Sequence, residues 1–142
     1  MKKFTLFIIG LVISLPFSGL AKTIVDTTDF WHILYNNKTI ALYNQQDKNP
    51  PITIKRSKIK PNDILSFSYG DDTPCSECET GLYLLDKNRK RILLSKSKGT
   101  FKPIKIPLNE ILNQAKIANK NYLDFYYFDA QHNRFVFRLK LE

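Results

Sequence analysis

Hydrophobic and polar residues alternate with a period of two along most of the chain after residue 29. The pattern is clearest in two C-terminal segments, 122–128 and 134–142, which the polar residues 129–133 connect. Alternation of this kind places one face of a strand on a core and the other in water, so the two segments predict a β-hairpin. The side chains expected on its inner face are Leu123, Phe125, Tyr127, Phe135, Phe137, Leu139 and Leu141.

Segments further upstream repeat this pattern and predict more strands. These strands are expected at 30–35, 39–44, 52–59, 65–69, 81–85, 91–94 and 101–106. Segment 52–59 breaks the parity, because Ile52 and Ile54 share a face on which Ile59 does not lie. We therefore expect a bulge or bend near Arg56.

One segment, 107–118, has the periodicity of a helix rather than of a strand. Its apolar residues follow one another at spacings of three and four, which is typical of an amphipathic helix. They are Leu108, Ile111, Leu112 and Ala115. Asn109 is expected to cap the start of this helix.

About seven to nine short strands and one late helix predict an all-β fold, an antiparallel β-sandwich. We expect a single domain over residues 22–142, in which a hairpin at 30–44 precedes a core sandwich at 52–141. The strand rhythm of that core resembles immunoglobulin-like and fibronectin-like sandwiches. The cysteine bridge of antibody domains is missing, because Cys75 and Cys78 lie close together in one loop. Their strand tryptophan is also missing, because Trp31 lies in the N-terminal hairpin. The sequence leaves open whether that hairpin joins the sandwich, and a shared architecture implies no activity.

Residues 1–21 have the three-part layout of a secretory signal peptide. Two lysines are followed by the almost wholly apolar residues 4–15, and Gly19 and Ala21 are the small residues before a cleavage site. We expect cleavage after Ala21. An apolar run of this length is short for a bilayer, and no second one follows. The sequence thus predicts an exported protein, periplasmic or secreted, with no transmembrane segment in the mature chain, and its composition favours a bacterial source.

Composition and charge exclude several classes of protein. The chain has 142 residues, of which 43% are hydrophobic and 13% aromatic, which is too rich for a disordered protein. Two cysteines are too few for a disulfide-dense miniprotein or a four-cysteine zinc site. The formal net charge of +9 favours an anionic surface or an acidic envelope protein as a partner, although bases spread over many turns are also typical of a solvated surface. No nucleic-acid motif is present, so no nucleic-acid partner is expected.

The two cysteines, Cys75 and Cys78, lie in a loop between two predicted strands. In an exported protein a structural disulfide is the favoured interpretation. A thiol-redox site is the alternative, but strand-like sequence follows Cys78, whereas a reactive thiol needs a feature such as a helix N-terminus to lower its pKa. A metal site is disfavoured because neither His32 nor His132 has ligand spacing to the cysteines. We therefore expect no metal and no cofactor.

The cysteine loop is acidic, whereas the rest of the mature chain is basic. Its acids are Asp71, Asp72, Glu77 and Glu79. A stiffened acidic loop on a basic body is a candidate recognition element, and its oxygen atoms are compatible with a weak calcium site. The plainer interpretation is a stapled turn.

Both faces of segment 122–128 are aromatic. Tyr122, Tyr126 and Phe128 occupy the face opposite the expected core. We expect the helix or the N-terminal hairpin to cover this second face, because the apolar stripe of the helix needs a surface to pack on. An exposed aromatic strip that binds a sugar ring or a partner is the alternative.

No catalytic constellation can be read from the chain, which lacks a nucleophile elbow and a glycine-rich phosphate loop. The sequence therefore predicts a protein that is not an enzyme and acts as a binding, accessory or structural module. One alternative is a redox or metal-handling protein that uses Cys75 and Cys78. Another is an inhibitor-like or toxin-neutralising partner protein whose acidic loop enters a basic cleft. The identity of the partner and the oligomeric state stay open.

Overall fold

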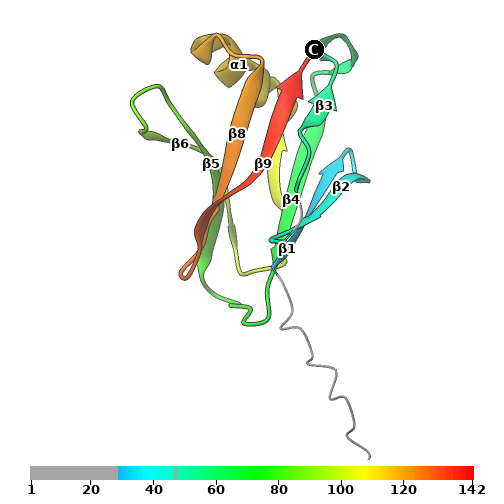
Figure 1. The fold of residues 1–142 in the computed structure, drawn as a ribbon. Coiled ribbons are helices and arrows are strands. Elements are labelled where there is room, and N and C mark those ends of the chain that lie inside the picture. Colours follow the sequence, from blue (N-terminus) through cyan, green and yellow to red (C-terminus); the bar gives the residue numbers. More distant parts are fainter. Residues whose placement is uncertain (1–28, 47) are drawn as a thin grey trace, which may run out of the picture.

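Nine strands in two packed sheets and one short helix form the fold of the computed structural model (Figure 1). The structure describes residues 29–46 and 48–142, so the predicted signal peptide lies outside the described residues. In chain order the elements are β1 (Phe30–Tyr35), β2 (Lys38–Asn44), β3 (Ile52–Ile54), a 3-10 turn (Arg56–Lys58), β4 (Ile64–Gly70), β5 (Glu79–Leu85), β6 (Arg91–Lys98), β7 (Ile104–Pro107), α1 (Leu108–Ala118), β8 (Tyr122–Phe128) and β9 (Asn133–Leu141). The predicted all-β class with one late helix is confirmed.

The two sheets have the strand orders β2-β1-β4-β7 and β3-β9-β8-β5-β6. The strand pairs are antiparallel with one exception, because β3 runs parallel to β9. The expectation of a purely antiparallel sandwich is wrong at this edge. The chain crosses from the first sheet to the second after β2, and β3 enters beside the C-terminal strand in the same direction.

The N-terminal hairpin is part of the first sheet rather than an addition to it. β1 lies between β2 and β4, and its pairing with β4 extends from Phe30 opposite Gly70 to Tyr35 opposite Leu65. Trp31 is consequently a core residue, with its ring stacked on Tyr69 at 6.1 Å between centroids.

The strand predicted at 52–59 is shorter than expected. β3 ends at Ile54, and the parity break comes from the 3-10 turn that follows, not from a bulge inside a continuous strand. The backbone N–H of Arg56 donates to the carbonyl of Glu142, which anchors this turn to the C-terminus.

The C-terminal hairpin carries a bulge that the alternation did not predict. Phe125 pairs with Phe137 and Tyr126 pairs with Phe135, so Val136 is an extra residue in β9. On one side of such a bulge, the residues of β9 that alternation places on the inner face lie on the outer face instead. Val136 and Phe137 are both fully buried, and Phe135 is 44% exposed. The expected inner position of Phe135 is therefore wrong, whereas the other predicted inner residues of this hairpin are buried.

The helix α1 begins one residue later than predicted and is not capped by Asn109. Pro107 occupies the N-cap position, which has no side-chain cap, and Asn119 ends the helix in the left-handed conformation. Within the part of the chain that the structure describes, no helix has the length and apolar character needed to cross a membrane.

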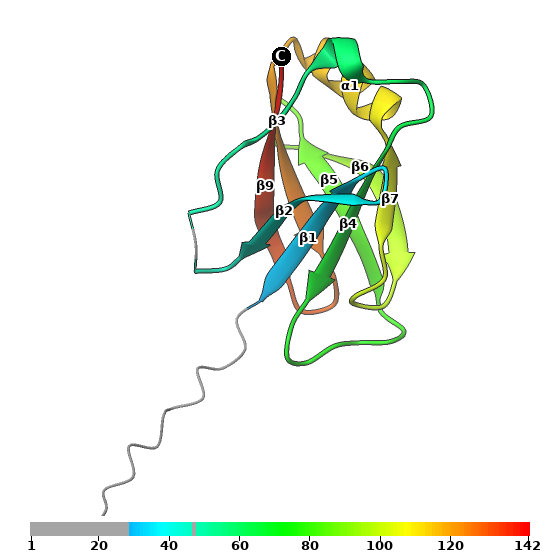
Figure 2. The same cartoon turned by 90° about the vertical axis from the view of Figure 1, so that its right-hand side faces the viewer.

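The helix α1 lies across one end of the two sheets (Figure 2), and its apolar stripe closes the core there. Its buried residues are Leu108, Ile111 and Ala115. The N-terminal hairpin belongs to the opposite sheet and does not cover the outer face of β8, so that part of the expectation is wrong. The C-terminal end of α1 reaches only the edge of this face, where Tyr122 is 45% exposed and Tyr126 and Phe128 are half-buried.

Candidate functional site

The cysteine loop docks on the connection between β6 and β7. The sulfur atoms of Cys75 and Cys78 lie at disulfide distance. Gly99 N donates to Cys78 O at 2.8 Å, and Thr100 N donates to Cys75 O at 2.9 Å. Gly99 has a φ of +85°, and a Cβ there would lie 2.7 Å from the carbonyl oxygen of Ser76. The loop is thus held by backbone contacts on one side in addition to the cysteine pair.

The four acids of this loop point to different places. Glu77 pairs with Lys98, and Glu79 pairs with Lys96 at 2.8 Å; both pairs are largely exposed. Asp72 is exposed, whereas Asp71 is buried. The four acids therefore do not form one site. Of the four, Asp71 alone joins a wider cluster of polar side chains.

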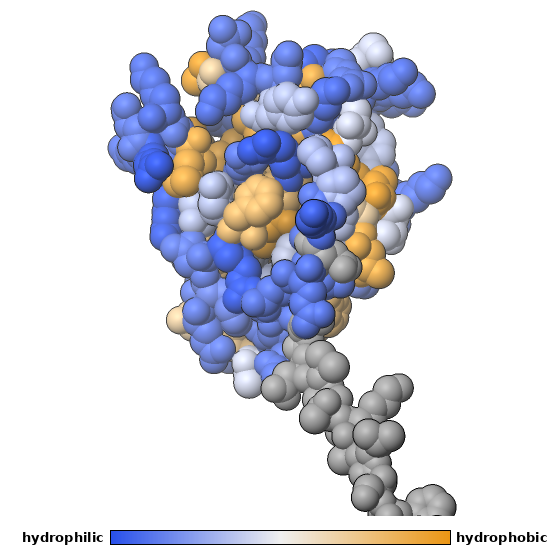
Figure 3. Space-filling view, in the orientation of Figure 1, coloured by the Kyte–Doolittle hydropathy of each residue, from blue (hydrophilic) through white to orange (hydrophobic). Residues whose placement is uncertain are grey.

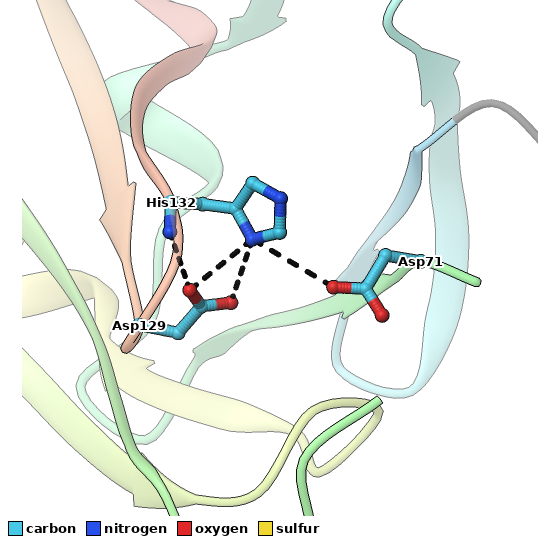
Figure 4. Close-up of side chains that lie close together, drawn as sticks. All are labelled: Asp71, Asp129 and His132. Carbon is cyan, nitrogen blue, oxygen red and sulfur yellow. Dashed lines mark hydrogen bonds and ion pairs between the residues drawn. The ribbon is translucent and has the colours of Figure 1, made fainter. Parts of the chain in front are cut away.

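Asp71 lies beside Asp129 and His132, which come from the turn between β8 and β9 (Figure 4). His132 Nδ1 is 3.1 Å from both carboxylate oxygens of Asp129 and 3.7 Å from Asp71 Oδ2. We call these three residues the His132 cluster. It lies at the end of the sandwich opposite α1 (Figure 1).

A second layer of polar groups surrounds the His132 cluster. Asp29 accepts from Tyr69 Oη at 2.5 Å and pairs with Arg134 Nη1 at 2.5 Å, and it lies 3.8 Å from His132 Nε2. Tyr127 Oη donates to Asp129 Oδ2 at 2.9 Å. The two tyrosine rings stack with centroids 4.2 Å apart, so this polar end is built directly on the aromatic core.

Burial and hydrogen bonding act differently on the two carboxyl groups of the cluster. Burial raises the pKa of Asp71, and the nearby carboxylates add to that effect. Burial also acts to raise the pKa of Asp129, but hydrogen bonds from the backbone N–H groups of Gln131 and His132 outweigh it and hold that pKa below its usual value. Burial, and then the hydrogen bonds to aspartates, raise the pKa values of Tyr69 and Tyr127.

Reasoning from the sequence missed this cluster because it treated His132 as a lone residue. The spacing of Asp129 and His132, three apart in a predicted turn, was the one local signal for their contact. Asp71 and Asp29 join them only through the pairing of β4, β1, β8 and β9, which is not readable from residue spacing.

A different set of residues forms an aromatic cluster on the outer face of the five-stranded sheet. Tyr83 on β5 stacks on Tyr126 of β8 at 5.3 Å, and Phe135 of β9 meets Tyr126 edge to face at 5.9 Å. The guanidinium of Arg91 lies 4.7 Å from the centre of the Tyr83 ring. Figure 3 shows an apolar island on this face with hydrophilic residues around it.

A cleft opens beside this aromatic cluster. β5 pairs with β8 only from Gly81 to Tyr83, and beyond Tyr83 the two strands separate. The space between them is a cleft of about 490 Å³. Its apolar lining comes from both strands, from β6 and from the C-terminal half of α1: Leu84, Leu85, Ile92, Ile117, Ala118, Tyr122, Leu123 and Tyr126. We call it the β5–β8 cleft.

Both carboxylates that line the cleft accept hydrogen bonds, whereas the two lysines that line it form no ion pair among the described residues. Asp124 forms a two-point pair with Arg138 at 2.5 and 2.8 Å, and Asp86 accepts from backbone N–H groups of its own turn. Lys87 and Lys120 also line the cleft, and neither forms an ion pair among the described residues. The cleft therefore combines an apolar floor with a rim that carries two lysines without ion pairs and Asp86, whose carboxylate is held by backbone N–H groups.

The chain was compared with models of protein families, with curated proteins and with solved structures, and none of them matches it.

Proposed function

We propose that this protein is an exported, non-catalytic binding module that holds an extended acidic segment of a partner protein in the β5–β8 cleft. The observation that carries the proposal is the separation of β5 from β8, which leaves an apolar cleft with two lysines at its rim in the middle of a sheet. Export rests on the signal-peptide layout of residues 1–21.

The backbone of the cleft favours an extended chain as the occupant. β5 continues to Leu85 and β8 begins at Tyr122, yet their ladder covers only Gly81–Tyr83 and its partners. Strand edges that lack a neighbour are the surfaces on which a peptide adds by main-chain hydrogen bonds. A peptide strand with alternating side chains places one set on the floor of the cleft and the other at its rim.

The charges favour an acidic occupant. Lys87 and Lys120 line the cleft without ion-pair partners among the described residues, Arg89 and Lys90 follow in the turn beside it, and Arg91 begins β6. A carboxylate near these side chains gains attraction and does not have to displace an existing partner. The apolar floor supplies most of the binding energy, since each fully buried aliphatic side chain contributes about 1.5–3 kcal/mol.

The strand arrangement supports the finer architectural assignment to an immunoglobulin-like sandwich. The order β9-β8-β5-β6 is that of the G, F, C and C′ strands of variable-type domains, and β4 pairs with β7 as B pairs with E. Under this assignment the hairpin β1–β2 takes the outer position of the B–E sheet. The β5–β8 cleft then lies between strands C and F, which pair in that architecture.

The cysteine loop supports a structural rather than a redox role. β5 begins at Glu79, directly after Cys78, so the pair adjoins a strand and not a helix N-terminus that would lower a thiol pKa. Glu77 and Glu79 already pair with lysines of β6, which leaves the loop poorly suited to enter a basic cleft of another protein.

A titration with a defined peptide tests the proposal. The probe is a capped hexapeptide of alternating valine and glutamate, and its control replaces glutamate by lysine. We expect the acidic peptide to bind more tightly than the lysine peptide by about tenfold or more in calorimetry. Binding of anionic phosphatidylglycerol vesicles without binding of the acidic peptide would show that the cleft serves a lipid and would overturn the proposal.

Two matched variants locate the binding. Ile117 is 70% exposed on α1 and lines the cleft, whereas Leu42 is 64% exposed on β2 of the other sheet. Ile117→Glu removes an apolar side chain from the floor of the cleft and adds a negative charge. We expect this change to weaken binding of the acidic peptide by about tenfold or more. Leu42→Glu is expected to leave the affinity unchanged. Equal effects of the two changes would contradict a role for the cleft.

A further inference from the structure

We propose that the His132 cluster is a binding site for one divalent transition-metal ion, with His132 Nδ1 and one carboxylate oxygen each of Asp71 and Asp129 as ligands. The proposal is independent of the β5–β8 cleft, which lies toward the α1 end of the sandwich. Imidazole nitrogen with carboxylate oxygen is a donor set that suits zinc-like ions.

The spacing of the donor atoms fits a shared ion. The three atoms all lie within 4.8 Å of one another, and the imidazole nitrogen is 3.1 Å from Asp129 Oδ2 and 3.7 Å from Asp71 Oδ2. Ligands about 2.1 Å from one ion are separated by roughly 3.0–3.6 Å at tetrahedral or octahedral angles. The ion can therefore bind with small side-chain movements and without rearrangement of the backbone.

The buried carboxylate of Asp71 has one hydrogen bond and one longer contact, with His132. It is only 2% exposed, and its Oδ1 accepts from Thr73 N at 3.1 Å. Its Oδ2 points at His132 Nδ1 from 3.7 Å, beyond hydrogen-bond distance, and accepts no hydrogen bond among the described residues (Figure 4). This oxygen and the imidazole nitrogen therefore face each other at a separation that a shared ion would bridge.

The groups behind the ligands have the arrangement that metal sites use to orient them. His132 Nε2 lies 3.8 Å from the carboxylate of Asp29, at ion-pair rather than hydrogen-bond distance, and Asp29 is itself held by Arg134 and Tyr69. In metal sites the second imidazole nitrogen donates to such a carboxylate, which leaves the first nitrogen free for the metal, and Asp29 is the carboxylate placed to take this role. Asp129 is fixed by Tyr127 Oη at 2.9 Å.

The charge of this end of the sandwich favours a cation. Asp29, Asp71 and Asp129 are all at least largely buried, and Arg134 is the one permanent cation among the described residues that pairs with them. Three carboxylates near one guanidinium leave excess negative charge in a region with little water. A divalent ion neutralises that excess.

Calorimetric titration of the protein with Zn²⁺, with Ca²⁺ in a parallel experiment, tests the site. We expect one Zn²⁺ per chain, weaker binding of Ca²⁺, and a rise in melting temperature of roughly 10 °C at about a hundred times the dissociation constant. His132→Gln and Asp71→Asn are expected to lower the Zn²⁺ affinity by about a hundredfold or more, since even groups behind a ligand change affinity by 10–100-fold.

His32→Gln and Asp72→Asn are the matched controls. His32 lies on β1, and Asp72 is the exposed neighbour of Asp71. Both are expected to bind Zn²⁺ as the unchanged protein does. Because asparagine has the size of aspartate, Asp71→Asn keeps the test valid if His132→Gln fails to fold. The absence of one-to-one Zn²⁺ binding, or equal loss in a control and in a ligand variant, would overturn the proposal.

Discussion

Tyr83 stacks on Tyr126 at the last point where β5 pairs with β8, with 5.3 Å between ring centroids and 22° between ring planes. The hydroxyl of Tyr83 donates to Asn133 Oδ1 at 2.5 Å, which ties β5 to the start of β9. Beyond this stack the two strands diverge and the β5–β8 cleft begins. The Tyr83–Tyr126 contact thus closes one end of the cleft and joins the two halves of the five-stranded sheet.

Removing the Tyr83 ring is expected to destabilise the fold, whereas removing a neighbouring exposed ring is not. Tyr83 is 4% exposed and Tyr122, which also faces outward, is 45% exposed. We expect Tyr83→Ala to lower the free energy of unfolding by about 3 kcal/mol and Tyr122→Ala to change it by about 0.5 kcal/mol or less. Urea denaturation measures both. Similar losses in the two variants would contradict the packing described for this face.

The pair of Tyr35 and Asp63 predicts how stability changes at acidic pH. Hydrogen bonds from Lys60 N, Tyr35 Oη and Asn36 Nδ2 lower the pKa of Asp63 below its usual value. A carboxyl whose pKa is lower in the folded state stabilises the fold above its unfolded pKa of about 3.9, and this contribution is lost as the pH falls through the folded pKa. Asp63→Asn should therefore be less stable than the unchanged protein at neutral pH, and the difference should shrink below about pH 4.

The same pair of residues predicts how the stability of the fold changes at alkaline pH. The hydrogen bond to Asp63, followed by burial and the negative charge of Asp63, raises the pKa of Tyr35 to about 12. A tyrosine with a raised pKa stabilises the fold fully below its unfolded pKa of about 10, and the contribution is lost as the pH rises toward 12. Tyr35→Phe should flatten the loss of stability over this window. Unfolding curves at several pH values measure both limbs, and a parallel shift at every pH would contradict the assignment.

Loss of the cysteine pair is expected to have a small effect on stability and none on peptide binding. The ring between Cys75 and Cys78 is short, so in the chain-entropy model its contribution is about 2 kcal/mol or less. The double change Cys75→Ser, Cys78→Ser should lower the free energy of unfolding by that amount. Thiol titration of the native protein should detect no free thiol, and rapid reduction by a mild reductant to a low-pKa thiol would favour the redox interpretation.

The sequence predicted the elements of this fold better than their faces and neighbours. Period-two alternation predicted β8 and β9, but it placed Phe135 inside, because a one-residue bulge at Val136 leaves no mark in the pattern. Helical spacing predicted α1, but Asn109 is not its cap, since the chain leaves β7 at Pro107 and turns directly into the helix. Bulges and caps depend on the neighbouring strands, which local patterns do not contain.

The candidate sites depend on contacts between distant segments and were predicted less well. The sequence singled out the acidic loop as a place to look, but of its four acids only Asp71 meets His132. The β5–β8 cleft exists because the two strands stop pairing after Tyr83, although both continue with the alternation of a strand. No residue pattern in either strand predicts that separation. Long-range pairing decides both features.

The most direct test of the central claim is a map of where the acidic valine–glutamate peptide contacts the protein. Backbone amide resonances of the isotope-labelled protein are followed by nuclear magnetic resonance as the peptide is added. We predict saturable shifts concentrated at Leu84, Leu85, Ile117 and Leu123, which line the cleft, and their loss in Ile117→Glu. Saturable shifts confined to the outer face of β1 and β2, or no shifts at all, would contradict the claim that the β5–β8 cleft is the binding site.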